Sequence, residues 1–279
     1  MGTTIVNVGN TPSLTVPDLK VPIVNTYYPV NYTKGYLSYS FGANYEIDSD
    51  LAVFARTSEG GRFNAERLLF GGGVIQSGPG IGGTSQDDAV NHVWQNEGGV
   101  KYRVGAMSLF VTAFYARTEE TNADFTDLAE PYINDVFRAY GIEFEASYRF
   151  GDFGIRGGVT YTDSTVVSAL DNPSSVGKQP ASLAPWIYQL TPSYSRGPLT
   201  IGINVIGQSG SYVDNLDTEV EPGFVEVNMF AEYGLSRSLK LSIRGNNILD
   251  VIGITEVDGT TVARSINGRT FEGSLRYSF

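Results

Sequence analysis

Long stretches in which apolar and polar residues alternate strictly constrain the fold of this chain more than any other feature. A strand with this pattern has one apolar and one polar face, because successive side chains point to opposite sides of the backbone. In the C-terminal segment, the residues on the apolar face are Phe271, Gly273, Leu275, Tyr277 and Phe279, and those on the polar face are Glu272, Ser274, Arg276 and Ser278. Helical periodicity is hard to find anywhere in the sequence. We therefore predict an all-β protein.

The alternation predicts eleven strands. They are expected at residues 36–47, 51–60, 93–104, 107–121, 136–150, 153–165, 183–195, 198–212, 223–234, 238–249 and 268–279. Several of them run to about 10 to 15 residues, whereas strands in globular proteins are typically about five or six residues long. A tilted strand needs about 9–11 residues to cross a bilayer. The lengths therefore indicate strands that span a membrane.

The connections between these strands alternate between short and long without exception. Short connections are expected at residues 48–50, 105–106, 151–152, 196–197 and 235–237, and long ones at residues 61–92, 122–135, 166–182, 213–222 and 250–267. In a soluble β-sandwich, short and long connections are not expected to lie at opposite ends of the sheet. In an outer-membrane β-barrel, tight turns face the periplasm and long loops face outward.

Aromatic residues on the apolar faces gather near the short connections and the C-terminus. They are Tyr45, Tyr102, Tyr148, Phe150, Phe153, Tyr194, Tyr233, Tyr277 and Phe279. Rings at the level of lipid headgroups form such girdles, because the ring is buried in lipid while its polar edge stays wet. The polar faces carry charges of both signs, which suit a wet lumen or one filled by another protein segment. We predict an antiparallel transmembrane β-barrel in the outer membrane of a Gram-negative bacterium.

Composition argues against several functions. The net charge of −11 argues against a nucleic-acid partner, because binding phosphates requires a basic face. The chain has no cysteine, and His92 is its only histidine, so thiolate or histidine metal sites and a catalytic triad are not expected. The stretch "GPGIGG" (78–83) lacks the strand and helix of a dinucleotide site and is interpreted as a flexible loop. We predict no cofactor, no resident metal and no enzymatic activity.

Acidic residues cluster in two of the long connections. One cluster comprises Glu119, Glu120, Asp124, Asp127, Glu130 and Asp135, and the other comprises Asp214, Asp217, Glu219 and Glu221. Clustered carboxylate oxygens suit hard cations such as Ca²⁺, but neither stretch has EF-hand spacing, so calcium binding stays an open question. Glu143 and Glu145 share one strand face. That pattern favours a charged ladder lining a lumen over a glycosidase-like pair.

The C-terminal sequence "NNILDVIGITEVDGTTVARSINGRTFEGSLRYSF" (246–279) resembles the end of TonB-dependent outer-membrane receptors. In that family, an "NNLFD"-like stretch, a final loop and a "GR-x-aromatic" start of the last strand lead to a terminal Phe. The segment "LAVFARTSEGGRFNAERLLFG" (51–71) is similar to a mid-barrel segment of the same family. Together with the alternation of short and long connections, the resemblance covers most of residues 30–279.

The resemblance implies a barrel of about 22 strands closed by an N-terminal plug. It also implies uptake of a scarce ligand, such as a siderophore, a vitamin or a carbohydrate, with energy supplied through TonB. Residues 1–35 are expected to be part of an outer loop, and residues 36–279 to be barrel strands. The sequence shows no plug domain, TonB box or signal peptide and has an odd number of strands. We therefore expect the C-terminal half of a receptor, present as a fragment.

The expected partners follow from the same resemblance. They are outer-membrane lipid, the barrel assembly machinery, a plug and N-terminal half-barrel with TonB beyond them, and a small nutrient ligand. In the family, a segment like "GGRFNAER" lies at an outer strand end, which makes Arg62, Asn64 and Arg67 candidates for ligand or plug contact. Tyr277 and Phe279 would belong to the signal read by the assembly machinery. Two alternatives remain open: a small self-contained porin- or adhesin-like barrel, with a twelfth strand from residues 1–35, and an outer-membrane hydrolase.

Overall fold

The computed structural model describes residues 35–63, 90–123, 132–170, 172–258 and 262–279. Its strands are β1 (Tyr39–Glu46), β2 (Leu51–Phe63), β3 (Val90–Val104), β4 (Met107–Ala123), β5 (Tyr132–Phe150), β6 (Phe153–Ala169), β7 (Trp186–Arg196), β8 (Leu199–Gln208), β9 (Ser211–Tyr212), β10 (Val220–Glu221), β11 (Phe224–Gly234), β12 (Leu239–Asn246), β13 (Ile254–Asp258), β14 (Val262–Ser265) and β15 (Thr270–Tyr277). A short 3₁₀ helix, η2 (Pro173–Ser175), lies before β7. None of the helices in these ranges has the length and apolar character needed to span a membrane.

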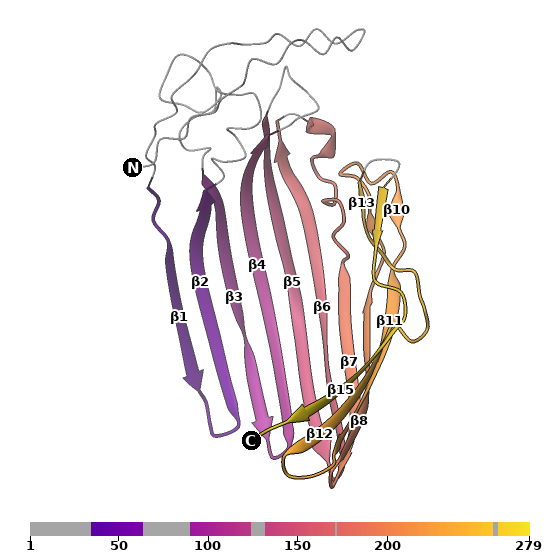
Figure 1. Cartoon of the computed structure of the whole chain (residues 1–279). Coiled ribbons are helices and arrows are strands. Elements are labelled where there is room, and N and C mark those ends of the chain that lie inside the picture. The colour runs from indigo at the N-terminus through magenta and orange to yellow at the C-terminus, as the bar shows by residue number, and fades with distance from the viewer. Residues whose placement is uncertain (1–34, 64–89, 124–131, 171, 259–261) are drawn as a thin grey trace, which may run out of the picture.

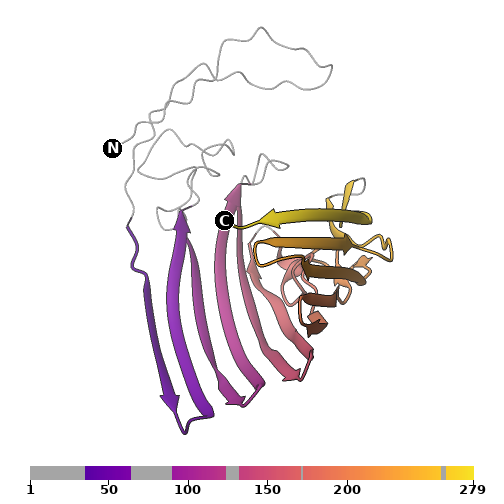
Figure 2. The same cartoon turned by 60° about the horizontal axis from the view of Figure 1, so that its bottom comes forward.

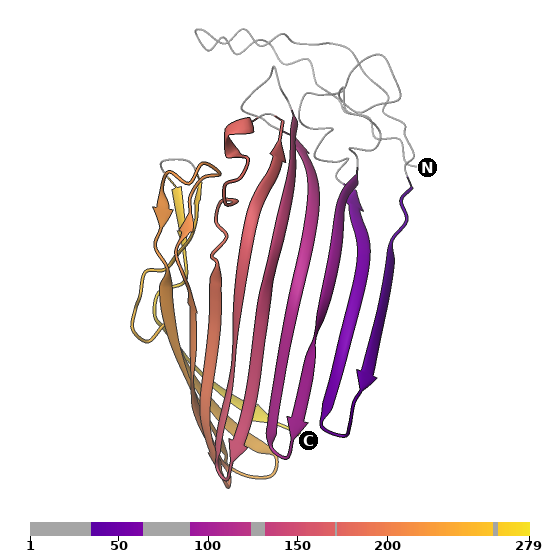
Figure 3. The ribbon, with the colours of Figure 1, turned by 180° about the vertical axis from the view of Figure 1, so that it is seen from behind.

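Eleven strands form one antiparallel sheet in the order β1-β2-β3-β4-β5-β6-β7-β8-β11-β12-β15. Each corresponds to one predicted strand, so the predicted antiparallel all-β class is confirmed. The sheet is strongly curved, because β7 to β15 turn away from the plane of β1 to β5 (Figures 1 and 2). The view from behind shows β1 at one edge of the sheet (Figure 3). Within the described residues β1 pairs only with β2, and β15 only with β12, so the barrel is not closed there.

The short connections lie together at one end of the sheet, at the bottom of Figure 1. Gly105, Gly151 and Gly197 each have a positive φ in one of these turns, a conformation that residues with a side chain adopt only under strain. The described long connections lie toward the opposite end. Two of them contain the hairpins β9–β10 and β13–β14, each a separate two-stranded sheet that the alternation does not predict.

The observed strand ends differ from the predicted ones at the long-loop end. β4 continues to Ala123 and β5 begins at Tyr132, beyond the predicted limits. The segment predicted as one strand, 198–212, divides instead into β8 and β9, which belong to different sheets. Ladder hydrogen bonds join backbone groups whatever the side chains are, so pairing continues where the apolar–polar pattern fades. The predicted outer-loop segment 1–35 lies outside the described residues except for Gly35.

The apolar face of the sheet is left open by the described residues. Phe41, Tyr45 and Phe271 are each about two-thirds exposed. In the described part, the buried hydrophobic residues are only Val90, Val166 and Ala169. Soluble proteins rarely expose large contiguous apolar surfaces to water. In outer-membrane β-barrels a bilayer covers such a face. The hydrophobic core of a soluble sandwich is absent from the described ranges.

On the polar face, aromatic rings lie over glycines of the neighbouring strand. A Cβ added to Gly141 would overlap the carbonyl oxygen of Tyr161 and approach Phe114 Cζ to 2.7 Å. A Cβ at Gly99 would lie 2.7 Å from Phe54 Cε1. The missing side chain is what allows each ring to lie close to the strand beside it. Two of the 33 glycines therefore have a packing role in β3 and β5.

Candidate functional site

The polar face of the curved sheet is the candidate functional surface. The cross-strand register places on it Arg56, Glu97, Lys101, Glu143, Glu145, Arg149, Arg156, Glu226, Glu232, Lys240, Arg244, Glu272 and Arg276. Positive and negative groups are interleaved along it. Such a face must be wet or covered by a polar partner, because charged groups that face lipid are costly.

Toward the two edges of the sheet, some of these charges pair with one another. Arg56 lies directly opposite Glu97, with 3.4 Å between Nη1 and Oε1, and its Nε donates to Ser40 Oγ at 3.0 Å. Near the other edge, Lys240 Nζ lies 2.8 Å from Glu232 Oε2. Exposed pairs of this kind contribute little to stability, typically about 0–1 kcal/mol. They neutralise these four side chains, whereas Lys101, Arg244, Glu272 and Arg276 form no ion pair within the described residues.

On the polar face, the central strands β5 and β6 carry four charges without an ion pair among the described residues. Within the described residues, the side chains of Glu143, Glu145, Arg149 and Arg156 form no ion pair, and their direct cross-strand neighbours are uncharged. Glu143 and Glu145 are two positions apart on the same face, so both carboxylates point to the same side of the sheet. The middle of the polar face therefore carries charges that remain available to another molecule.

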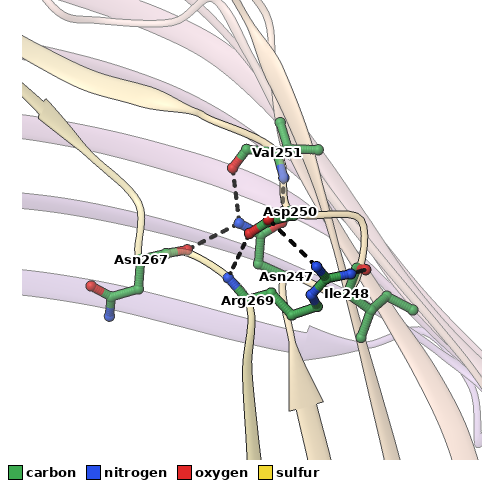
Figure 4. A network of polar contacts seen from close by, with 6 residues as sticks. All are labelled: Asn247, Ile248, Asp250, Val251, Asn267 and Arg269. Atoms are coloured by element: carbon green, nitrogen blue, oxygen red, sulfur yellow. Dashed lines mark hydrogen bonds and ion pairs between the residues drawn. The ribbon is translucent and has the colours of Figure 1, made fainter.

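Asn247 is the first residue of the last long connection, immediately after β12. Its side chain is almost completely buried, at 1% exposure. Its Nδ2 donates to the carbonyl oxygens of Val251 at 2.8 Å and Asn267 at 3.0 Å, and its Oδ1 accepts from Val251 N at 2.9 Å (Figure 4). Its φ of 47° lies in the left-handed region, which Asn tolerates better than most residues.

Asp250 and Arg269 complete this clamp. The backbone N–H of Arg269 donates to Asp250 Oδ1 at 3.0 Å, and the Arg269 Nη2 lies 3.6 Å from Asp250 Oδ2 (Figure 4). Arg269 Nη1 also donates to the carbonyl oxygen of Ile248 at 3.4 Å. The "NNILD" stretch and the "GR" before the last strand are thus joined in space. Their role in this structure is to hold the end of β12 next to the start of β15.

The β6–β7 connection and the β9–β10 hairpin are tied together at the long-loop end. Asp217 Oδ1 accepts from the backbone N–H of Gln179 at 3.2 Å, and Asp217 Oδ2 lies 3.7 Å from Lys178 Nζ. Asn215 Oδ1 accepts from the backbone N–H of Ala181 at 2.7 Å. These contacts place two connections from different parts of the sequence side by side above β7 and β8.

Three of the four acidic side chains of this hairpin, those of Asp214, Asp217 and Glu221, have partners within the protein. Hydrogen bonds from the Thr218 hydroxyl and backbone N–H lower the pKa of Asp214, and the backbone N–H of Leu216 adds to the effect. Glu221 is 2% exposed and accepts from Ser211 Oγ at 3.4 Å. Across the described ranges, no three acidic or histidine side chains are grouped so that they could hold a metal ion. The other acidic cluster falls partly outside those ranges.

Of the predicted site residues, the structure describes Arg62, Tyr277 and Phe279. Arg62 is exposed near the loop end of β2, opposite Asn91. Tyr277 is opposite Leu239, and the Tyr277 and Phe279 rings lie 6.4 Å apart, both largely exposed at the short-turn end. Asn64 and Arg67 lie outside the described residues. Whether any of these positions contacts a ligand, a plug or the assembly machinery stays a prediction.

A second group of aromatic residues lies on the apolar face and was not predicted from the sequence. It comprises Trp94, Tyr115, Tyr140, Tyr161 and Trp186, toward the long-loop ends of the strands. Tyr140 is eight positions from Tyr148 on the same face of β5. With a rise of about 3.3 Å per residue and a tilt of about 40°, that separation corresponds to about 20 Å along the membrane normal. The apolar band is therefore bounded by aromatic residues on both sides. The second group could have been predicted from the sequence, because its members lie on the same strand face as the first group and about eight residues away.

Three solved structures that share this fold are described as receptors. The siderophore receptor PiuA of Acinetobacter baumannii has a TM-score of 0.69 and 18% identity, with 90% of this chain covered. The ferric yersiniabactin uptake receptor FyuA of Yersinia pestis has a TM-score of 0.66 and 17% identity, with 86% covered. The ferripyoverdine receptor of the outer membrane of Pseudomonas aeruginosa has a TM-score of 0.66 and 18% identity, with 92% covered.

The chain spans only part of these proteins: 37% of the lengths of PiuA and FyuA and 34% of that of the ferripyoverdine receptor. At these identities the likeness shows the fold alone. A search of curated proteins finds no match. The sequence itself matches the family model described as TonB dependent receptor-like, beta-barrel, over residues 9–248. This match, with the eleven-stranded sheet and its two distinct faces, shows that the chain belongs to the β-barrel family of TonB-dependent receptors.

Proposed function

We propose that this chain is part of an outer-membrane receptor barrel that takes up a small nutrient ligand with energy supplied through TonB. The separation of the two faces of β5 carries the proposal. Ile142 and Phe144 are exposed on the apolar face, while Glu143 and Glu145, in adjacent positions, lie on the polar face. An outer-membrane barrel presents its apolar band to lipid and its polar residues to the lumen. Membership of the receptor family supports the same role.

The lumen of the proposed receptor is occupied by a plug that packs against the central part of the polar face. The uncompensated charges of Glu143, Glu145, Arg149 and Arg156 support this, because a polar protein segment can supply groups of opposite charge. The exposed Arg62, at the loop end of the same face, is proposed to contact ligand or plug, together with Asn64 and Arg67. Tyr277 and Phe279 are proposed to be read by the barrel assembly machinery.

An iron chelate is the first ligand class to test. Several proteins with this fold are described as receptors for siderophores or ferric complexes, which supports that order without deciding it. The test compares the native host with a strain from which the coding region is deleted, under iron limitation. Loss of growth or of ⁵⁵Fe uptake on one chelate, in a manner that also requires TonB, is the expected outcome. Unchanged uptake of iron chelates, vitamins and carbohydrates would contradict the proposed transport.

Membrane topology is tested independently of transport. The sequence has no cysteine, so single cysteines can be labelled without background. We expect Leu216→Cys, in the β9–β10 connection, to react in intact cells with a membrane-impermeant maleimide. Arg237→Cys, in the short β11–β12 connection, should react only after the outer membrane is permeabilised. Equal labelling of both variants in intact cells, or recovery of the chain outside the outer-membrane fraction, would contradict the location.

A further inference from the structure

Two arginines face each other on the apolar side of the sheet, at the long-loop edge of the second group of aromatic residues, where Arg117 lies opposite Trp94. Arg117 of β4 lies directly opposite Arg138 of β5, two residue pairs beyond Tyr115 and Tyr140. Residues directly opposite in an antiparallel pair project from the same face, so both guanidinium groups point away from the lumen. They lie about 7 Å further along the strands than the tyrosines, given a rise of about 3.3 Å per residue.

This position corresponds to the lipid headgroup layer. Tyr115 and Tyr140 are exposed and mark the level at which the apolar band ends. Charged side chains within the hydrocarbon are costly, whereas those just outside an aromatic girdle meet water and headgroups. The depth of the two arginines therefore matches the phosphate-bearing layer of a leaflet and not its acyl chains.

Directly opposed like charges destabilise an antiparallel pair unless something else compensates them. Arg117 Nη2 lies 3.1 Å from Glu119 Oε1, which neutralises that side chain in part. Arg138 Nη2 makes one long hydrogen bond, 3.4 Å to Thr165 Oγ1. The Arg138 Nε is buried and has no acceptor among the described residues. Arg138 is thus the less satisfied of the two.

The surroundings of Arg138 hold it in place but do not neutralise it. Its guanidinium carbon lies 5.7 Å from the centroid of the Tyr140 ring. The nearby carboxylate of Asp163 accepts a hydrogen bond from the Tyr140 hydroxyl at 2.9 Å, and no ion pair joins Asp163 to Arg138 within the described ranges. A planar guanidinium with open donors is suited to bidentate recognition of a phosphate oxygen pair.

We propose that Arg117 and Arg138 bind a phosphate group of a lipid headgroup in the outer leaflet. The proposal rests on the outer-membrane location proposed above and adds a specific lipid contact to it. A phosphate placed between the two guanidinium groups offsets their repulsion and accepts hydrogen bonds from their terminal N–H groups. A lipid is favoured over a free anion because the pair lies on the lipid-facing side at headgroup depth.

The experiment uses the whole chain in detergent micelles, with bisphosphorylated lipid A as the probe and native mass spectrometry to count bound lipid. The double variant Arg117→Gln/Arg138→Gln should bind lipid A about tenfold more weakly or worse, since charge-assisted hydrogen bonds are about twice as strong as neutral ones. Glu119→Gln should bind a few-fold more tightly, because it frees Arg117 and removes a repelling charge. Arg149→Gln/Arg156→Gln removes the same charge from the polar face and should bind as the unchanged chain does.

Three results would overturn the proposal: unchanged binding in the Arg117/Arg138 double variant, equal binding of dephosphorylated lipid A, or displacement of lipid A by an equal concentration of inorganic phosphate. A heat-dependent shift in electrophoretic mobility checks that each variant is folded. Should the double variant not fold, Arg138→Lys is used in its place. Lysine keeps the positive charge but lacks the paired N–H donors of a guanidinium, so lipid A binding should weaken severalfold. Equal binding by this variant would count against the proposal. Because the readout is in micelles, failure here is distinguishable from failure of the cysteine-labelling or uptake experiments.

Discussion

The side-chain amide of Asn247 donates a hydrogen bond to the carbonyl oxygen of Asn267, 20 residues further along the chain, at 3.0 Å. This contact spans the whole last connection and joins the end of β12 to the residues that precede β15. Within the described residues, β15 pairs with no strand other than β12. Its position therefore depends on the eight-pair ladder with β12 and on this clamp.

Asn247→Ala is expected to destabilise the C-terminal strand pair. The substitution removes the part-buried hydrogen bonds to the carbonyl oxygens of Val251 and Asn267, each of which typically contributes about 0.5–1.5 kcal/mol. Asn246→Ala is the matched control, because Asn246 is exposed and, among the described residues, its side chain bonds only the Thr270 hydroxyl. The measurement is urea unfolding of the chain in detergent micelles, followed by tryptophan fluorescence. Equal unfolding midpoints for the two variants would mean that the clamp does not stabilise the fold.

Gly141→Ala is expected to destabilise the sheet by about 1–3 kcal/mol, because overpacking forces the neighbouring groups to move. The added Cβ meets the carbonyl oxygen of Tyr161 and the Phe114 ring, of which only the ring can shift. Gly60→Ala is the control, since a Cβ there has no atom within 4 Å. The same unfolding assay compares the two. If Gly141→Ala is as well tolerated as Gly60→Ala, the close packing of Phe114 on Gly141 is not required.

Phe144→Arg and Tyr115→Arg test the depth of the membrane band. Phe144 lies well inside the apolar band, where an arginine should cost about 2–4 kcal/mol, whereas near an interface the cost is about 0–1 kcal/mol. Tyr115 lies in the second aromatic group, so its substitution should cost less. The measurement is unfolding of the chain from phosphatidylcholine vesicles. Similar costs at both positions, or a reversed order, would show that the bilayer boundary lies elsewhere.

The stability of the β9–β10 connection should depend on pH through Asp214. Hydrogen bonds from Thr218 lower its pKa in the folded chain. A carboxyl whose folded pKa is depressed contributes stability that is fully present above its unfolded pKa and is lost as the pH falls through the folded pKa. We therefore expect the hairpin to loosen in acid, and less so in Asp214→Asn. Thr218→Val should raise the pKa of Asp214 toward its ordinary value, as measured by carbon-13 NMR of the labelled carboxyl; an unchanged pKa would contradict the assigned cause.

Glu143→Gln and Glu97→Gln distinguish an effect on ligand uptake from an effect on the stability of the sheet. Glu143 has no ionic partner among the described residues, so its neutralisation should change stability by less than about 0.5 kcal/mol. Glu97 loses its pair with Arg56, an exposed contact worth about 0–1 kcal/mol. In the native host, Glu143→Gln should reduce ligand uptake more than Glu97→Gln. The reverse order of uptake would place the functional charge near the edge of the sheet and away from its centre.

Much of the fold could be predicted from local patterns. The alternation of Ile142 and Phe144 with Glu143 and Glu145 assigns each residue to a face, because a strand has a period of two whatever its partners are. The glycines at Gly105 and Gly151 mark tight turns for a similarly local reason. The eleven strands of the main sheet, their order along the chain, their apolar and polar faces and the sorting of short and long connections were all present in the sequence.

Contacts between strands required the tertiary structure. No pattern within one strand reveals that Arg117 is opposite Arg138, or that Arg56 meets Glu97, because those pairs depend on the register between strands. The hydrogen bond from Asn247 to Asn267 likewise depends on how a long connection folds back on itself. The sequence alone therefore specified eleven two-faced strands, and tertiary pairing decided which of their charges are neutralised and which remain open to another molecule, because electrostatic interactions act between neighbours in space.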